Sequence, residues 1–446
     1  MLNILKNRTY ARLFTAQIVA LFGTGLLTIA LGLTAFDLAG DKAGQVLGLA
    51  LTIKMVAYVG FSPIATALVA RLDRRHVLIG ADLIRAAAAL ALPFIDAAWQ
   101  IYVLIFLLQA ASATFTPTFQ AVIPDILPAE SDYTRALSLS RLAYDTENLI
   151  SPALAGLLLT IVAPSTLFVG TTLGFLISAA LVWRTTIPTP VASTSRPFRE
   201  RLTTGIRIYL ATPRLRGLLA LNLTVAGVGA VVIVLSVVIV KSVYSGSDSD
   251  LAVALAAYGI GSMIVALILP RLLDHMPDRP VMLAAGAVGA ALMTVLGLTI
   301  SLSGWPSWPV LLTMWALIGA AMAAIMTPSG RLLRRSAQAR DRAAIFAAQF
   351  ALSHACWLLA YPLAGFAGTY LGLGPTMIAL GLFGLVGVVI ARAVWPAETS
   401  VGLEHRHTGL PPDHPHLKGA TRQGNAFVHR HSIVIDDEHR VWPTHG

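Results

Sequence analysis

The chain has 446 residues, of which 56% are hydrophobic and only 12% charged, and its mean hydropathy is +0.74. Because about a quarter of the residues of a soluble domain are charged, this composition excludes a soluble globular protein and indicates a polytopic membrane protein in a lipid bilayer. The net charge of +10 does not indicate nucleic-acid binding, since the basic residues gather in short loops, where they set topology.

Apolar segments long enough to cross a bilayer, about 20 residues each, recur along the whole chain. The first is full length, so we interpret it as a membrane helix and not as a cleaved signal. The pattern predicts an all-α membrane protein with twelve transmembrane helices. The predicted spans are 10–36, 44–70, 77–96, 99–123, 136–161, 164–184, 215–240, 251–272, 280–303, 307–328, 345–369 and 375–395.

The predicted helices form two six-helix halves, residues 1–184 and 215–395, with a tail over 396–446. Residues 185–214 form the linker: a Pro-rich stretch, then bases alternating with apolar residues from Arg199 to Arg214. We expect this second part to be an amphipathic helix on the inner membrane surface.

Charge bias predicts the orientation of the chain. Loops on the side of the termini are rich in arginine, whereas the opposite loops hold only Lys42 and Lys241 as basic residues. Basic loops stay in the cytoplasm. The prediction is a multi-pass membrane protein with both termini cytoplasmic.

Lys54 lies in the middle of the second predicted helix. A lysine at membrane depth is costly unless it is paired, so we expect it to face a cavity and meet a carboxylate, Glu147 or Asp37. A purely structural ion pair is the alternative interpretation.

The fifth predicted helix carries four polar residues: Arg141, Asp145, Glu147 and Asn148. Arg141 and Asp145 share a helix face and can pair, either as a purely structural pair or facing a cavity. Glu147 lies about 200° from Asp145 around the helix. Removal of a carboxylate from water favours its protonated form, so Glu147 is the better candidate for a proton carrier or a cation ligand.

The eleventh predicted helix resembles the fifth in sequence. When Gly365 is aligned with Gly156, His354 aligns with Asp145 and Cys356 with Glu147. Taken alone, His354 and Cys356, the only cysteine, are ordinary packing residues. Together with the acidic residues of helix five they make a mixed O, N and S ligand set, which suits nickel, cobalt or zinc.

The tail holds eight of the eleven histidines, three pairs of which have the form His-x-His. In an extended chain, residues i and i+2 lie on one side, so each pair can chelate one metal ion. The alternatives are a metal-binding tail and a merely polar one. A short strand is expected within 429–443. The candidate ligands are His405, His407, His414, His416, His429, His431 and His439, and His445 is the eighth histidine.

Several stretches resemble the major facilitator superfamily. Residues 67–85 resemble its helix 2–3 signature, and 117–128 with Arg135-Ala-Leu are similar to the helix 4–5 junction of the bacterial branch of the enterobactin exporters. Tyr361-Pro-Leu-Ala-Gly365 fits that branch, and the tail resembles those of nickel/cobalt-resistance exporters. The resemblance implies a location in the bacterial plasma (inner) membrane, a substrate site near the midplane between the halves, and action as a monomer.

The helix 2–3 signature departs from the family pattern at Thr66 and Ala70, where the family has glycine and aspartate. Asp73, Arg74 and Arg75 remain. The resemblance implies that these residues form the cytoplasmic gate, with Asp73 in the role of the missing aspartate or with a looser gate.

The sequence thus predicts a transporter and not an enzyme, since it has no P-loop for ATP hydrolysis and no catalytic triad. The preferred hypothesis is proton-coupled export of a divalent transition metal, nickel or cobalt first, with no permanently bound cofactor. One alternative is an exporter of small organic compounds such as a drug, a siderophore or a metabolite. The other is a metal sensor that does not transport.

Overall fold

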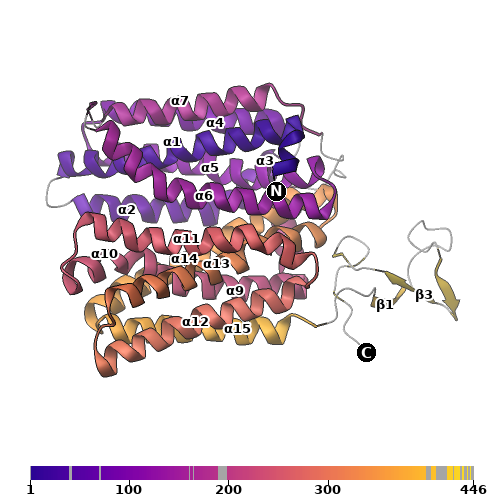
Figure 1. Ribbon diagram of the computed structural model, residues 1–446. Helices are drawn as coiled ribbons and strands as arrows, with labels where there is room; N and C mark the ends of the chain where they lie inside the picture. Colours follow the sequence, from indigo (N-terminus) through magenta and orange to yellow (C-terminus); the bar gives the residue numbers. More distant parts are fainter. Residues whose placement is uncertain are drawn as a thin grey trace.

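The computed structural model describes residues 2–39, 43–69, 72–159, 161–163, 165–188, 198–397, 403–407, 419–424, 426–431, 434–435, 439 and 442. Two groups of long helices run side by side, and the chain begins and ends at the same end of the bundle (Figure 1). We call this the terminus end. Eleven of the described helices are long and apolar enough to cross a membrane.

The N half comprises the helices coloured indigo to magenta in Figure 1. Its elements are η1 (Leu2–Lys6), α1 (Arg8–Ala39), α2 (Ala43–Val56), η3 (Ala57–Phe61), α3 (Ser62–Val69), α4 (Arg74–Ala91), η4 (Leu92–Phe94), α5 (Ala98–Ile126), α6 (Glu130–Leu158) and α7 (Thr166–Trp183).

The C half follows the linker helix α8 (Phe198–Ala211). Its elements are α9 (Pro213–Ala230), η5 (Val231–Leu235), α10 (Ser236–Val238), η6 (Ile239–Val243), α11 (Asp248–Leu273), α12 (Asp278–Ser303), α13 (Trp308–Arg335), η7 (Ala339–Asp341), α14 (Arg342–Tyr370) and α15 (Leu373–Val394).

Ten of the twelve predicted spans match these helices to within three residues, whereas α6 begins six residues earlier and α13 ends seven residues later than predicted. Helix α6 is the one predicted span that is not among the eleven helices long and apolar enough to cross a membrane. It nevertheless packs inside the bundle against α1 and α11. It begins at Glu130, six residues before the predicted start, because Glu130 and Asp132 fall in its first turn, where negative charge is favourable. Its charges thus lower its hydropathy without removing it from the membrane fold.

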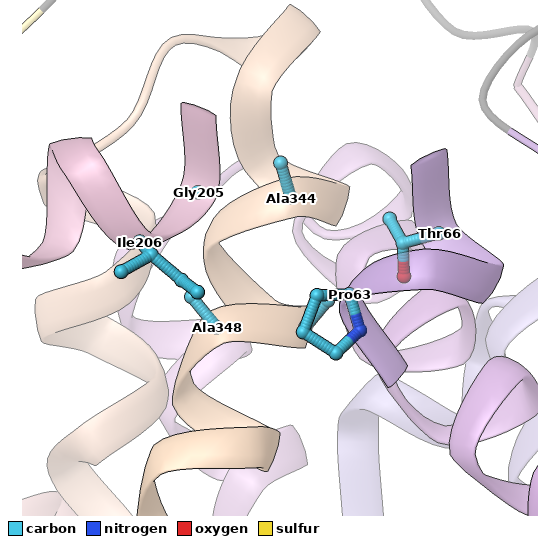
Figure 2. A pocket seen from close by; sticks show the side chains of 7 residues that line it. Pro63, Thr66, Gly205, Ile206, Ala344 and Ala348 are labelled. Atoms are coloured by element: carbon cyan, nitrogen blue, oxygen red, sulfur yellow. The ribbon is translucent and has the colours of Figure 1, made fainter. Parts of the chain in front are cut away.

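The linker helix α8 does not simply lie on a membrane surface. It packs against α3 of the N half and α14 of the C half, with Ile208 and Tyr209 almost fully buried. Figure 2 shows Gly205 and Ile206 of α8 beside Ala344 of α14. The void between these helices is only about 10 Å³, room for about one water molecule, so this contact is a packed one and not a ligand site.

Gly205 makes this close contact possible, which gives a testable prediction. A Cβ at position 205 would lie 2.1 Å from the carbonyl oxygen of Ala344, whereas a Cβ on Gly80 would meet no atom within 4 Å. We expect Gly205→Ala to destabilise the protein by about 1–3 kcal/mol, as overpacking does, and Gly80→Ala to be neutral or slightly stabilising. Thermal unfolding in detergent measures both, and equal midpoints for the two variants would contradict the packing described.

The tail contains a small antiparallel sheet beyond the terminus end (Figure 1). Strands β1 (Leu403–His407), β2 (Thr421–Gln423) and β3 (Ala426–His431) pair in the order β1-β3-β2. The strand predicted within 429–443 overlaps only the end of β3, which stops at His431, and the described residues 434–435 are not in a strand. The reason is that Ile435 is buried in the core of the C half, against which Trp442 also packs.

Candidate functional site

Asp125 joins the two halves at the terminus end. It lies in the last turn of α5 and forms an ion pair with Arg74 of the N half at 2.6 Å. Its other oxygen pairs with Arg342, the first residue of α14 in the C half. All three side chains are less than a fifth exposed. The attraction is therefore only partly screened by solvent, and it holds α5 against α14.

A second ion-pair cluster lies at the same end. Glu130 of α6 contacts Arg331 at 3.0 Å and Arg335 at 2.5 Å, both on α13 of the C half. Asp278 holds the same two arginines from within the C half, at 3.4 and 3.0 Å. Both clusters join the N half to the C half at the terminus end. The structure thus has its terminus end closed.

Asp73, Arg74 and Arg75 do not act as one unit. Asp73 accepts a hydrogen bond from the backbone N–H of Arg75 at 2.7 Å and so caps α4. The Arg75 side chain donates to the carbonyl of Trp183, within the N half. Only Arg74 contacts a carboxylate that bridges the halves, and this carboxylate is Asp125 and not Asp73.

A polar network crosses the middle of the bundle between α6 and α11. Arg141 pairs with Asp145 at 2.9 Å, as their spacing predicts. Ser262 of α11 donates to Asp145 at 2.5 Å and accepts from Arg141 Nε at 3.0 Å. The pair is therefore not only intrahelical, because a hydroxyl of the opposite half completes it.

Glu147 belongs to a different environment from Asp145. Its Oε1 would lie 2.6 Å from a Cβ on Gly25, and Ser151 Oγ would lie 2.2 Å from the same position. Glycine thus lets α1 approach α6 here. Lys54, from the helix that follows α1, interacts electrostatically with Glu147. The sequence predicted either Glu147 or Asp37 as the carboxylate that meets Lys54. The side chain of Asp37 lies outside the described residues.

Aromatic rings connect Lys54 to the C half. The Lys54 ammonium lies 5.6 Å from the ring centre of Tyr58. That ring stacks edge-on against His354 of α14 at 4.7 Å and also contacts Phe350. His354 Nδ1 is 2.7 Å from the carbonyl of Phe350. Tyr58 lies in η3, a π-helical turn, and such turns are frequent at functional sites.

The proposed metal ligands of the helices do not come together. Cys356 is 4% exposed, lies in the C-half core and donates through Sγ to the carbonyl of Leu352, whereas His354 faces Tyr58. In the residues searched, all within the described part, no three His, Cys, Asp or Glu side chains could hold one ion. The side chain of Asn148 lies outside the described residues.

The tail ligands are only partly described. His439 is almost fully buried. His405, His407, His429 and His431 are described by their backbone in β1 and β3. His414, His416 and His445 lie outside the described residues.

One buried ion pair of the N half was not predicted from the sequence. Asp82 and Arg85 of α4 pair with each other, and neither is more than a tenth exposed. The Arg85 guanidinium lies 4.2 Å from the Phe115 ring centre and 4.5 Å from that of Phe175. The sequence signal that could have revealed this pair is the presence of two opposite charges three residues apart in an apolar segment.

An apolar groove of about 520 Å³ lies between α3, α4 and α5. Several of its lining residues, such as Leu68 and Ile84, are half exposed on the outside of the N half. Asp73, a predicted gate residue, and His76 lie at its terminus end, and no residue of the predicted substrate or proton path lines it. This groove is therefore separate from the network around Glu147.

Two packed helical halves, joined at one end by ion pairs and holding buried charges at their junction, are the arrangement of a membrane transporter built from repeated halves. The sequence profile of the Major Facilitator Superfamily matches residues 13–245 and 217–427. The chain belongs to this superfamily, and it is a transporter and not an enzyme.

Similar proteins include Macrolide efflux protein A of Streptococcus pyogenes, 24% identical over 300 residues, which cover 66% of this chain and 72% of that protein. The uncharacterized MFS-type transporter YfiS of Bacillus subtilis (strain 168) is 23% identical over 397 residues, 85% of this chain and 93% of that protein. The enterobactin and nickel/cobalt branches do not appear among these relatives.

Solved structures share the fold. A bacterial homologue of the iron transporter ferroportin, in an outward-facing state, has a TM-score of 0.70 at 14% identity and covers 86% of this chain and 98% of its own. The human organic anion transporter MFSD10 has a TM-score of 0.70 at 10% identity, over 86% of this chain and 99% of its own.

Proposed function

We propose that this protein is a proton-coupled exporter of small organic compounds, and that Glu147 carries the proton. The observation that carries the proposal is the position of Glu147 on α6, beside Gly25 and Ser151 and within electrostatic reach of Lys54. A carboxylate within electrostatic reach of a lysine loses its attraction for that lysine when it gains a proton. The proton thereby alters a contact within the transport path.

The Lys54 side chain gives that contact an effect on the opposite half. When Glu147 is neutral, Lys54 loses its attraction to that side chain and is free to shift relative to the Tyr58 ring, whose centre lies 5.6 Å from its ammonium group. Tyr58 stacks on His354 of α14, so a shift of Lys54 acts on a contact between the halves. The Arg141–Asp145–Ser262 network is a second contact of this kind. In the proposed cycle both rearrange as the terminus end opens.

An organic substrate fits the described residues better than nickel or cobalt. The metal hypothesis requires Glu147, His354 and Cys356 to converge, yet Cys356 is buried in the C-half core. Aromatic rings, in contrast, lie at the junction of the halves, where they can pack on an apolar substrate. The name of the relative Macrolide efflux protein A supports efflux of an organic compound, and a macrolide is the first substrate to test.

Inside-out vesicles carrying the protein test this proposal directly. We expect a labelled macrolide to accumulate in them when the lumen is acidified, and the accumulation to collapse when the proton gradient is dissipated. Labelled Ni²⁺ is measured in parallel. Accumulation of Ni²⁺ without any organic compound would overturn the substrate class. Failure to accumulate any compound from a broad panel would favour the non-transporting sensor.

A further inference from the structure

The register of the tail sheet brings histidines from separate parts of the sequence together. In the antiparallel ladder of β1 and β3, His405 is directly opposite His429. Residues directly opposite each other belong to one face of a sheet, with their Cβ atoms about 4.5–5.5 Å apart. Two histidine positions that are 24 residues apart in sequence are therefore neighbours on one face of the sheet.

Strand alternation adds two more histidines to this face. His407 is two residues after His405, and His431 is two residues after His429, so each falls on the same face as its neighbour. We call the four positions His405, His407, His429 and His431 the histidine face. Arg406 and Arg430 fall on the opposite face. The two His-x-His pairs thus become one group of four because the register aligns them.

We propose that the histidine face binds one late divalent transition metal, with His405 and His429 as cross-strand ligands and His407 or His431 completing the set. Neutral imidazole is the commonest protein ligand for such metals, and zinc and nickel accept three or four ligands with metal–nitrogen distances of about 2 Å. A pair on two strands holds an ion more firmly than a flexible pair because the sheet has already fixed the two backbones.

The surroundings of the sheet support such a site. Phe427 lies opposite His407, and Leu403 lies opposite His431, so each end of the histidine face is flanked by an apolar position. Arg422 lies opposite Phe427 on the far strand β2, and its Nε donates to the carbonyl of Gly424 at 3.3 Å. The one arginine that register places on this face is thereby engaged with its own turn.

Ile435 and Trp442 fix the tail to the bundle. Ile435 is 1% exposed within the C-half core, and the Arg214 guanidinium lies 5.6 Å from the ring centre of Trp442. The site therefore belongs to a segment tethered at the terminus end. It is independent of the substrate proposed above, so either proposal can fail without the other.

Nickel titration of the purified full chain, prepared without a polyhistidine tag, tests the site. We expect one Ni²⁺ per chain by calorimetry, and a loss of affinity of at least about tenfold in the double variant His405→Ala with His429→Ala. The matched control removes the same number of imidazoles elsewhere in the tail, by His414→Ala with His416→Ala. It should change the affinity less than about twofold.

A second control separates ligand loss from loss of the sheet. Arg406→Ala with Arg430→Ala alters the same two strands on the face without histidines and should leave nickel binding unchanged. Equal weakening in the two histidine double variants would overturn the proposal in favour of indiscriminate binding by the tail. So would equal weakening in the arginine double variant, or nickel affinity that survives loss of His405 and His429.

Discussion

Replacement of Glu147 by Gln is expected to abolish accumulation driven by a proton gradient. The amide keeps the shape of the side chain but can neither bind nor release a proton, and it removes the electrostatic interaction with Lys54. In inside-out vesicles, uptake against a gradient should fall to the level of vesicles without the protein. Exchange of labelled for unlabelled substrate, which needs no net proton movement, should persist.

The matched control for this variant is Asp132→Asn. Asp132 is also on α6 and pairs with Arg135 at 2.9 Å, but this pair is about 40% exposed and such surface pairs contribute little. We expect Asp132→Asn to transport normally. If Glu147→Gln still concentrated substrate in response to a proton gradient, Glu147 would not be the proton carrier.

Neutralisation of Asp125 is expected to open the terminus end. Asp125→Asn leaves Arg74 and Arg342 without the carboxylate that both contact across the halves. Loss of one partner from a largely buried pair costs about 2 kcal/mol or more. Because the pair exists only while this end is closed, the loss falls on the closed state and shifts the equilibrium by about thirtyfold.

Spin labels on exposed residues either side of the gate measure this shift. Cysteines at Ser131 and Gln338, in a Cys356→Ala background, report the distance between α6 and the segment after α13 by pulsed electron paramagnetic resonance. We expect the distance distribution of Asp125→Asn to gain a longer component. Asp132→Asn, whose partner Arg135 is in the same half, should retain the short one. Identical distributions in the two variants would show that Asp125 does not hold the gate.

The helices were predictable from sequence because membrane depth leaves a direct signal. Apolar runs gave the spans, and α6 was found in spite of its charges because an uninterrupted run follows them. The spacing of Arg141 and Asp145 gave their ion pair, and the opposite direction of Glu147 followed from helical periodicity. These are local properties, which one sequence is sufficient to reveal.

Contacts between distant segments were not predictable in the same way. Asp125 lies in the 117–128 segment that resembles the helix 4–5 junction, but its role depends on Arg342, which lies 217 residues later. Nothing in the sequence of α11 marks Ser262 as a partner of Asp145. The proposed convergence of Glu147 and Cys356 failed for a related reason: alignment of a repeat gives equivalent positions on two helices, whereas the facing direction depends on how each helix packs.

The burial of Ile435 and the position of Trp442 have a practical consequence for the design of shortened chains. A truncation before residue 403 would remove the histidines together with an apolar side chain from the C-half core. A change in metal tolerance after such a truncation would therefore mix loss of ligands with loss of folded protein. Variants that are to report on the tail histidines should keep residues 434–442 and change single side chains. A reporter domain fused to the tail should follow Trp442 and not replace it.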